Sequence, residues 1–574
     1  GTLDSACTIT IGPNTVSKLW LIENATSGSQ NIIISQGSGA NITIANGQTK
    51  AIYSDGAGSG AAMVDAFQDL SIPDLFIDDD LTFSSDSAVI TFGADGDTTL
   101  THTDGSGLTL NSTNKIMFND ASQFIQGSSA TVLALGATDE IDLTATAMDF
   151  NGTVAISGDT TIEDGADLIT ASAGTSNTRI GVNTGNSITS GGNYNVLVGD
   201  EAGTALTTGD NNVAIGFEAL KTEDADGNNV AIGYQALKTL NAGATGGNTA
   251  VGYQAGVDLT TGVSNVILGY VAGPDLTDAD FNVAVGVGAL FADHKGSKST
   301  AIGHNALATQ DFTTSTDTFN TAVGFQAASN LTTGTFNTLI GGLAGDALTT
   351  GQQNVALGYN ALGAEDTGNK SVAVGISALA AQNNDANNFN TAVGHQAGLS
   401  VTTGIRNTLI GGLAGDAFTD ADLNVAIGYQ ALSSDTLGSR SVAIGNQALL
   451  TQNFTTATDG YNTAVGTDAG LLVTTGIRNT LLGALAGDAL TDADDNVAVG
   501  QQSLSSDTLG SGAVAIGHNA LFSQNFTTAT TNYNIAIGYK AGEAVTTGTK
   551  NTFVGGLAGD ALTEGEANVA LGYE

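Results

Sequence analysis

The residues that could do chemistry are few, and no catalytic pattern connects them. The five histidines are His102, His294, His304, His395 and His518. No combination of nucleophile, histidine and acid stands in a known setting, and neither a phosphate-binding loop nor zinc-ligand spacing occurs. The last three histidines occupy a repeated position that Tyr or Phe fills elsewhere, which indicates stacked rings. We therefore expect no enzymatic activity, no catalytic residue and no cofactor.

Recurring acidic turns are the pattern nearest to a metal site. Asp416, Asp420 and Asp422 form one such turn, and similar turns occur at 275–280 and 488–494. Clustered carboxylate oxygens suit Ca²⁺, but solvated turn carboxylates give the same pattern. Asp416, Asp420 and Asp422 are accordingly candidates for a calcium site, and we assign no metal.

Three long loops carry an aromatic residue among Thr, Asn and Gln. Phe312 lies in the loop 309–314, and the loops 451–456 and 523–528 repeat its pattern with Phe454 and Phe526. An exposed ring among hydroxyls and amides suits contact with a sugar. The alternative is a self-packed loop whose Phe covers the edge of the fold. Phe312, Phe454 and Phe526 are therefore candidate surface-contact residues.

A short repeat dominates the chain between residues 177 and 572. A phrase such as Asn424-Val425-Ala426-Ile427-Gly428 recurs 23 times, mostly 17 residues apart. The step after every fourth glycine is longer, so blocks of 70–72 residues repeat as well. Such a period is typical of a solenoid, in which each repeat forms one coil. We call the coil whose glycine precedes the longer step the fourth coil of its block.

The residues around each repeat glycine predict how a coil is built. The positions three and one before the glycine hold only Val, Thr, Ile or Leu, and the position between them holds Ala, Leu, Ile or Phe in all coils but that of Arg179. Alternate residues of a strand face opposite sides. We predict that the two β-branched positions stack inside the coil. The middle position would then face a second surface, for which another copy of the chain is the readiest source.

Three further regularities predict close packing. Where the middle position is large, as in Leu339, the residue after the glycine shrinks, as in Gly342; Ile267 with Tyr270 departs from this exchange. The position three after the glycine is almost always Ala. The glycine itself is expected at a corner with positive φ, and the leading Asn is expected to form a ladder of stacked amides at a turn.

The repeats resemble known fibrous proteins. Coils reading Asn-x-Val-Ala-Ile-Gly resemble the head repeats of trimeric autotransporter adhesins of the YadA type. The phrases Asn320-Thr321-Ala322-Val323-Gly324 and Asn407-Thr408-Leu409-Ile410-Gly411 are similar to repeats of marine bacteriophage tail fibres. The resemblance covers about 400 of the 574 residues. It implies a left-handed parallel β-roll with three chains side by side around one axis, although the adhesin repeat is shorter than this one.

The first 176 residues lie before the repeat and have a different sequence pattern. Alternating runs separated by Gly, Asn and Ser clusters predict a small all-β domain at 1–70. A second β-rich segment, resembling the shaft of marine phage fibres, is expected at 71–176, with phrases at 77–83 and 143–150. The predicted architecture is therefore all-β: small N-terminal β domains, then a parallel β-solenoid of about 23 coils at 177–574, in a homotrimeric fibre.

Composition limits the function classes. The formal net charge of −42 disfavours nucleic acid, and no apolar run of membrane length appears, so we expect no membrane insertion. Cys7 is alone, which excludes a disulfide within the chain. Because Gly1 is not Met and the chain stops within a coil, we expect an anchor or tip outside these residues.

Three functional readings follow from the sequence. The first is a phage tail fibre on the virion, a rigid trimer that positions a tip on a host receptor, with glycan as one candidate. The second is a trimeric adhesin on a bacterial surface. The third is a monomeric solenoid such as an ice-binding protein, which needs an outward Thr array. The Thr column three before the glycine is predicted to face inward, which counts against the third reading.

Overall fold

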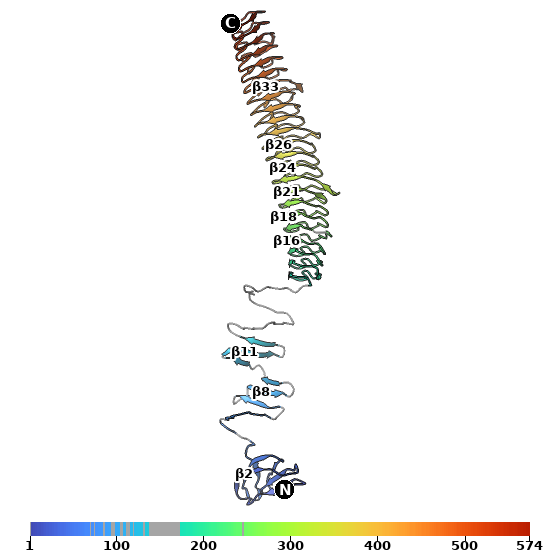
Figure 1. Cartoon of the computed structure of the whole chain (residues 1–574), viewed down its shortest axis with the longest axis vertical. Helices are drawn as coiled ribbons and strands as arrows, with labels where there is room; N and C mark the ends of the chain where they lie inside the picture. The colour runs from blue at the N-terminus through green and yellow to red at the C-terminus, as the bar shows by residue number, and fades with distance from the viewer. Residues whose placement is uncertain are drawn as a thin grey trace. The chain divides into compact units, whose positions relative to one another are not determined.

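A computed structural model describes residues 2–68, 71–73, 75–83, 87–92, 98–103, 107–110, 115–118, 120–129, 132–136, 173–243 and 246–574. The chain divides into two compact units, Gly1–Asp159 and Thr160–Glu574 (Figure 1). The phrase at 143–150 lies outside the described residues. Each unit is described by itself.

The N-terminal part of the first unit is a small β domain, as the alternating runs predicted. The strands β1 (Cys7–Thr10), β3 (Ile32–Ser35) and β4 (Ile42–Ile44) form one sheet. The second sheet is antiparallel and contains β2 (Ser17–Glu23), β5 (Thr49–Asp55) and β6 (Met63–Asp65), with the 3-10 turn η1 (Gly58–Gly60) before β6. Side chains from both sheets form one buried cluster: Ile32, Ile34, Ile44, Ile52 and Met63.

Two antiparallel three-stranded sheets follow along the chain. One contains β7 (Val89–Phe92), β8 (Thr98–Thr103) and β9 (Gly107–Leu110), and the other contains β10 (Lys115–Phe118), β11 (Asp120–Ser129) and β12 (Val132–Gly136). Most of their described large apolar side chains are exposed, including Val89, Phe92, Ile116, Ile125 and Leu135, while Ile90 and Leu100 are half-buried. Within one chain, therefore, the described part of these sheets forms no buried apolar cluster.

The second unit is a parallel β-solenoid. Its main sheet contains 23 three-residue strands, each hydrogen-bonded to the next along the chain and each in identical register (Figure 1). With strands ~4.8 Å apart, the stack extends roughly 110 Å. The strands are β13 (Thr178–Ile180), β14 (Val196–Val198), β15 (Val213–Ile215), β16 (Val230–Ile232), β17 (Thr249–Val251), β18 (Val266–Leu268), β19 (Val283–Val285), β21 (Thr300–Ile302), β23 (Thr321–Val323), β24 (Thr338–Ile340), β25 (Val355–Leu357), β26 (Val372–Val374), β27 (Thr391–Val393), β28 (Thr408–Ile410), β29 (Val425–Ile427), β31 (Val442–Ile444), β33 (Thr463–Val465), β34 (Thr480–Leu482), β35 (Val497–Val499), β37 (Val514–Ile516), β39 (Ile535–Ile537), β40 (Thr552–Val554) and β41 (Val569–Leu571).

Three small parallel pairs brace the long loops of the fourth coils. They join β20 (Gly296–Ser297) to β22 (Thr316–Asp317), β30 (Gly438–Ser439) to β32 (Thr458–Asp459), and β36 (Gly510–Ser511) to β38 (Thr530–Thr531).

The direction of the strand side chains is opposite to the prediction. The middle residue, such as Ala426, is fully buried, whereas its β-branched neighbours Val425 and Ile427 are only half-buried. The prediction was wrong because it placed the larger aliphatic side chains inside. The coil is too thin for them: its interior is filled by the middle residue, by the Ala three after the glycine and by the residues four and seven after it. The β-branched residues consequently face outward.

The size exchange noted in the sequence has an interior partner that the sequence analysis missed. Large middle residues lie against glycines four residues after a repeat glycine. A Cβ added at Gly398 would lie 2.7 Å from Cδ1 of Leu409, and one added at Gly542 would lie 2.9 Å from Cδ2 of Phe553. Close packing leaves no room for both side chains. Gly342 and its equivalents face outward, so they do not make this space.

The corners and the amide ladder are as predicted. All 23 repeat glycines have φ between 127° and 147°. A Cβ at Gly428 would lie 2.3 Å from the carbonyl oxygen of Gly445, so no other residue fits there. The Asn side chains are buried, and each stacks on the next. Asn424, for example, donates from its backbone N–H to Oδ1 of Asn407 at 3.0 Å and from Nδ2 to the carbonyl oxygen of Gly438 at 2.8 Å.

The fourth coils replace the ladder Asn by a different amide. Ser441 stands at the Asn position there, and Gln452 from the following turn enters the interior instead. Its Oε1 accepts a 2.9 Å hydrogen bond from Nδ2 of Asn462, the next ladder residue. Gln310, Gln382 and Gln524 make the same bond in their blocks. In the four later blocks, the longer step after the fourth glycine thus supplies the amide that the ladder lacks, whereas the fourth coil of the first block keeps Asn229 at the ladder position.

Candidate functional site

The outward strand face is the largest apolar feature of the solenoid. It consists of the residues three and one before each glycine, all aliphatic or Thr, in 23 successive coils. Several are exposed in the single chain: Ile180, Val196, Ile215, Val251, Val266, Ile302, Ile340, Val393, Ile410, Val465, Ile535, Ile537 and Val554. We call this surface the strand face. A continuous exposed apolar surface of this kind marks a contact site.

A column of rings borders the strand face on its C-terminal side. It is formed by the residue directly after each glycine, and we call it the post-glycine column. Phe217, Tyr234, Tyr253 and Tyr270 stack in four successive coils, with ring centroids 5.0–5.4 Å apart and interplanar angles of 8–19°. Their exposed fractions are 39–56%. The stacking holds the rings in line while leaving one side of each open.

A second column borders the strand face on its N-terminal side. It is formed by the residue five before each glycine, two residues ahead of the strand, and we call it the pre-strand column. Six of the chain's 14 Lys and Arg residues stand in it: Lys298, Lys370, Arg406, Arg440, Arg478 and Lys550. Exposed rings alternate with them, and Lys370, for example, lies 5.1 Å from the centroid of Phe389. On a chain of net charge −42, this concentration of cations is a distinct surface feature.

The aromatic residues of the long loops do not face solvent. Phe312, Phe454 and Phe526 are only 8%, 5% and 6% exposed. Their backbone N–H groups donate to buried carboxylates, as Phe454 does to Oδ1 of Asp435 at 3.1 Å. The prediction of a sugar contact through these rings is therefore wrong. Each ring covers the edge of a coil, which was the alternative.

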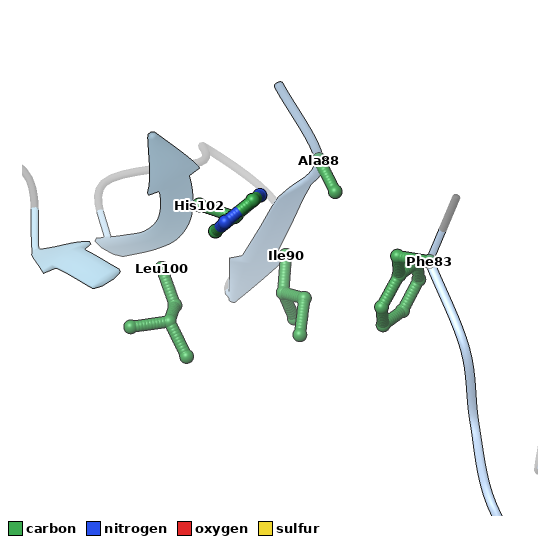
Figure 2. A pocket seen from close by; sticks show the side chains of 5 residues that line it. All are labelled: Phe83, Ala88, Ile90, Leu100 and His102. Carbon is green, nitrogen blue, oxygen red and sulfur yellow. The ribbon is translucent and has the colours of Figure 1, made fainter. Parts of the chain in front are cut away.

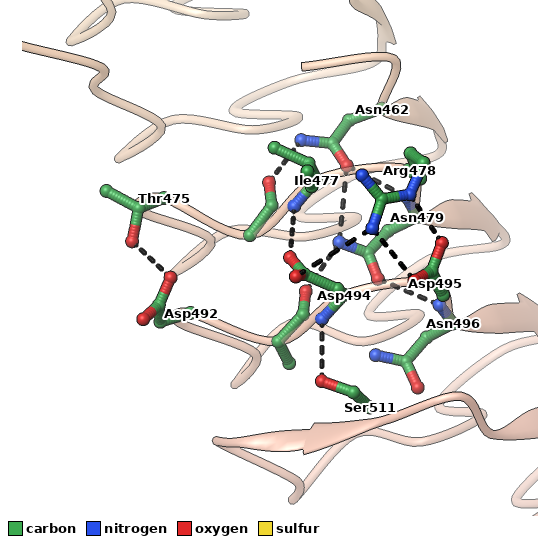
Figure 3. Close-up of polar contacts among 12 residues, drawn as sticks. Asn462, Thr475, Ile477, Arg478, Asn479, Asp492, Asp494, Asp495, Asn496 and Ser511 are labelled. Atoms are coloured by element: carbon green, nitrogen blue, oxygen red, sulfur yellow. Dashed lines mark hydrogen bonds and ion pairs between the residues drawn. The ribbon is translucent and has the colours of Figure 1, made fainter. Parts of the chain in front are cut away.

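The acidic turns use their carboxylates to link successive coils. Oδ1 of Asp494 accepts the backbone N–H of Ile477 at 2.8 Å, and Oδ1 of Asp492 accepts the hydroxyl of Thr475 (Figure 3). The candidate calcium residues do the same: Asp416 accepts from Ser433, Asp420 from Thr403, and Asp422 from Ile405. Each of these carboxylates therefore has its own partner in a neighbouring coil. Within the described ranges, no three His, Cys, Asp or Glu residues converge as metal ligands do.

The histidines have structural surroundings. His304 stacks on Phe325 and His518 on Tyr539, as the shared position predicted. Nδ1 of His294 lies 2.8 Å from Oδ1 of Asp311, and this hydrogen bond raises the pKa of His294 above its ordinary value. In the first unit, His102 lies with Phe83, Ala88, Ile90 and Leu100 around an apolar hollow on the β7–β8–β9 sheet (Figure 2).

Buried carboxylates recur once in each block, and the sequence analysis missed them. Oδ2 of Asp435 accepts Nε2 of Gln452 at 2.6 Å, and Oδ1 accepts the N–H of Gly438 at 3.0 Å. Asp293, Glu365 and Asp507 have equivalent Gln partners. Burial raises the pKa of all four acids. A repeated signal was present in the sequence: an acid seven after the third glycine of a block, followed by Gln seven after the fourth.

The first block differs because its buried acid has no Gln. Leu240 occupies the Gln position, and Oε2 of Glu223 is buried without a hydrogen-bond partner. Desolvation raises the pKa of Glu223 to about 7. Asn229 keeps the ladder position that Ser takes in later blocks, so the amide there comes from the ladder itself.

An ion cluster covers the surface beside this part of the first block. Nζ of Lys221 lies 2.5 Å from Glu201 and 2.6 Å from Glu218, and Lys238 reaches Glu218 at 2.7 Å. Hydrogen bonds from Lys221, Lys238 and Gln235 lower the pKa of Glu218 to about 2.

The chain has no match among known family models, curated proteins or solved structures. No helix among the described residues is long and apolar enough to cross a membrane. What the protein does must therefore be argued from its own surfaces. The strand face and its two bordering columns are the features that a partner of this solenoid would contact.

Proposed function

We propose that the protein is the rod of a phage tail fibre, in which three copies stand side by side. The observation that carries the proposal is the strand face, which stays partly exposed along 23 coils although all its residues are aliphatic or Thr. A single chain would present this face to water over roughly 110 Å. Covering it with further copies removes the apolar surface from water, which favours assembly by ~25 cal/mol for each Å² covered.

The exposed apolar residues of the first unit support the same proposal. Ile90 and Leu100 line a hollow whose other wall, Phe83, is itself half exposed (Figure 2). Apolar surface left exposed on such sheets marks a contact site, and covering it removes it from water. Further copies of the same segment would supply that cover.

The resemblance of the coils to YadA-type heads and marine phage fibres supports a fibre on a particle or cell surface. A rigid rod would act by reach, and three identical ends would bind a host receptor with the gain that linked sites provide. This function requires no catalytic group.

Labelling of virions tests the location. Antibodies raised against residues 177–574 should decorate the tail of purified virions in electron micrographs, and mass spectrometry should detect the polypeptide in them. Labelling of the producing cell's surface with bare virions would contradict the phage assignment and support the bacterial adhesin.

One observation favours the ice-binding alternative. The Thr residues three before the glycine, such as Thr408 and Thr480, face outward and not inward as predicted, so the argument against that reading was wrong. They alternate with Val along the strand face, as at Val425 and Val497. Thermal hysteresis of ice growth by a monomeric chain would support this alternative over the fibre.

A further inference from the structure

In most coils the residue sizes in the two columns that border the strand face are inversely related. A small or polar pre-strand residue usually goes with a ring after the glycine, and a long pre-strand residue with a small one; Lys298 with His304, Lys370 with Ile376 and Leu423 with Tyr429 depart from this pattern. The first kind pairs Asn211 with Phe217, Asn228 with Tyr234, Gly247 with Tyr253, Ser264 with Tyr270, and Gln353 with Tyr359. The second kind pairs Phe336 with Gly342, Arg406 with Gly412, Tyr461 with Thr467, Arg478 with Ala484, and Lys550 with Gly556.

Block duplication alone does not explain the exchange. The second coil of the second block has Ser264 with Tyr270, whereas the second coil of a later block has Arg406 with Gly412. Both positions have changed, in opposite directions, between coils of the same type. The first coils with Phe319 and Phe325, Phe389 and His395, or Tyr533 and Tyr539 carry rings in both columns. The pair Ser264 and Tyr270 also accounts for Ile267, which departed from the exchange read from the sequence.

The two columns do not touch within one chain. Ladder Asn, strand and corner Gly separate them, and the four steps from Asn to Gly alone span roughly 13 Å. A Cβ added at Gly412 would have only Tyr429 and the backbone of His395 within 4 Å, both in its own column. Ring contacts also join members of one column, as between Phe319 and Phe336 or between His304 and Phe325. Residues compensate for each other's size only where they are in contact. Because these two columns do not touch within one chain, the contact must lie between chains.

We propose that the pre-strand column of one copy packs against the post-glycine column of a neighbouring copy, with each coil opposite the same coil. This inference rests on the proposed function, since it specifies how the copies of the rod meet. Two different columns form a heterologous contact, which closes only by rotation. Rotation about an axis along the rod keeps every coil at one height, and so it brings Arg406 of one copy to Gly412 of the next.

The chemistry of the columns fits such a contact. Lys298, Arg440 and Arg478 have Asp partners in their own chain, at 2.5, 3.0 and 2.6 Å. Among the described residues, Lys370, Arg406 and Lys550 have no ion-pair partner. Long cationic side chains at the rim of an apolar interface lay their methylene stems over apolar surface while the charge stays in water. Opposite a glycine, such a stem fills the space that a ring fills in other coils.

Disulfide trapping tests the pairing. In a chain with Cys7→Ser, the changes Arg406→Cys and Gly412→Cys place two thiols in one coil. Disulfides need Cα atoms within ~7 Å, so these thiols cannot join within one chain. The matched control combines Arg406→Cys with Gly342→Cys, four coils or roughly 19 Å apart along the rod. Mild oxidation should link the same-coil variant into covalent trimers on a non-reducing denaturing gel and leave the control as single chains.

The native mass of the same samples separates the two possible failures. Single chains on the gel from a protein that sediments as a trimer would overturn the pairing and leave the proposed fibre standing. A protein that sediments as a monomer would contradict the fibre as well.

A size swap gives an independent measurement. Gly412→Tyr should raise the concentration at which the trimer dissociates by roughly tenfold or more, because the long Arg406 of the neighbour already fills that space. Adding Arg406→Ser, which recreates the pair Ser264 and Tyr270, should restore most of the loss. Gly412→Ala is the control. Equal dissociation of the single and double variants would overturn the pairing.

Discussion

The first four-coil block and the later blocks use different residues around the buried acid and the amide ladder. In the later blocks a buried acid such as Asp435 is paired with Gln452, which also completes the amide ladder. In the first block the acid is Glu223, buried Leu240 stands at the Gln position, and the ladder keeps its own Asn229. The comparison teaches that the longer fourth coil is useful because it carries an amide inward. Where Asn229 already holds the ladder position, that amide is dispensable, but Oε2 of Glu223 is left without a donor, while Oε1 keeps the backbone N–H of Asp226 at 2.9 Å.

The largest effect is expected when a later block is changed to the residue pattern of the first block. Gln452→Leu removes the side-chain donor of buried Asp435 and the acceptor of Asn462. Each buried polar group left without its partner costs about 2 kcal/mol, so the two losses together cost about 4 kcal/mol. Hydrogen exchange should show faster opening of the amides of β31 and β33. Thr455→Val, at an exposed position of the same loop, is the control, and unchanged exchange in Gln452→Leu would refute the role of the pair.

The second prediction concerns the pH dependence that buried Glu223 gives to the stability of the first block. The pKa of Glu223 is about 7 in the folded chain, above the ordinary 4.5. A raised pKa means that the folded state binds a proton more tightly, so stability is greatest at low pH and falls as pH rises through the range 4.5 to 7. At pH 8 the cost is about 3 kcal/mol.

Glu223→Gln should abolish this pH dependence. Hydrogen exchange of the amides of β15 and β16, measured at pH 5.5 and pH 8 and corrected for the intrinsic rate, gives the local opening free energy. A wild-type protein whose local stability is equal at the two pH values would contradict the account.

The third prediction concerns the ladder, which both regions share. Asn212→Ala in the first block and Asn424→Ala in a later one each remove the acceptor of the next backbone N–H, at 2.9 Å in both cases. Each change should lower local stability by about 2 kcal/mol, since a buried N–H is left unsatisfied. Hydrogen exchange of Asn229 and Ser441 measures the two costs. Strongly unequal costs would show that the ladder differs between the regions.

The smallest effect is expected at the surface of the first block. The pKa of Glu218 is lowered to about 2, so its contribution is present above pH 4.5 and is lost as pH falls toward 2. Because the ion cluster with Lys221 and Lys238 reaches solvent, Glu218→Gln should cost below about 1 kcal/mol, and less at high salt. Thermal melts at low and high salt check this. A cost that does not change with salt would argue against an ionic origin.

The repeat alone was enough to predict the solenoid, its corners and its ladder. Glycine spacing fixes the coil length, and a positive φ at Gly428 and a buried amide at Asn424 follow from residue type. These features depend on backbone geometry, which the residue types Gly and Asn at fixed spacing indicate directly.

Which strand side chains face inward could not be predicted in the same way. Val425 and Ala426 are both apolar, so alternation by itself does not say which faces inward. The decision depends on the thickness of the coil, which is set by residues from the other side such as Gly415 and Phe418. The burial of Phe454 could not be predicted either, because an aromatic side chain in a polar loop can face the solvent or the coil.

The central claim is that further copies of the chain cover the strand face, and sedimentation equilibrium tests it most directly. The account predicts a native mass of about 171 kDa, three times the 57.1 kDa of one chain. A mass of 57.1 kDa at micromolar concentration would contradict it, because the strand face would then be open to water along the whole solenoid.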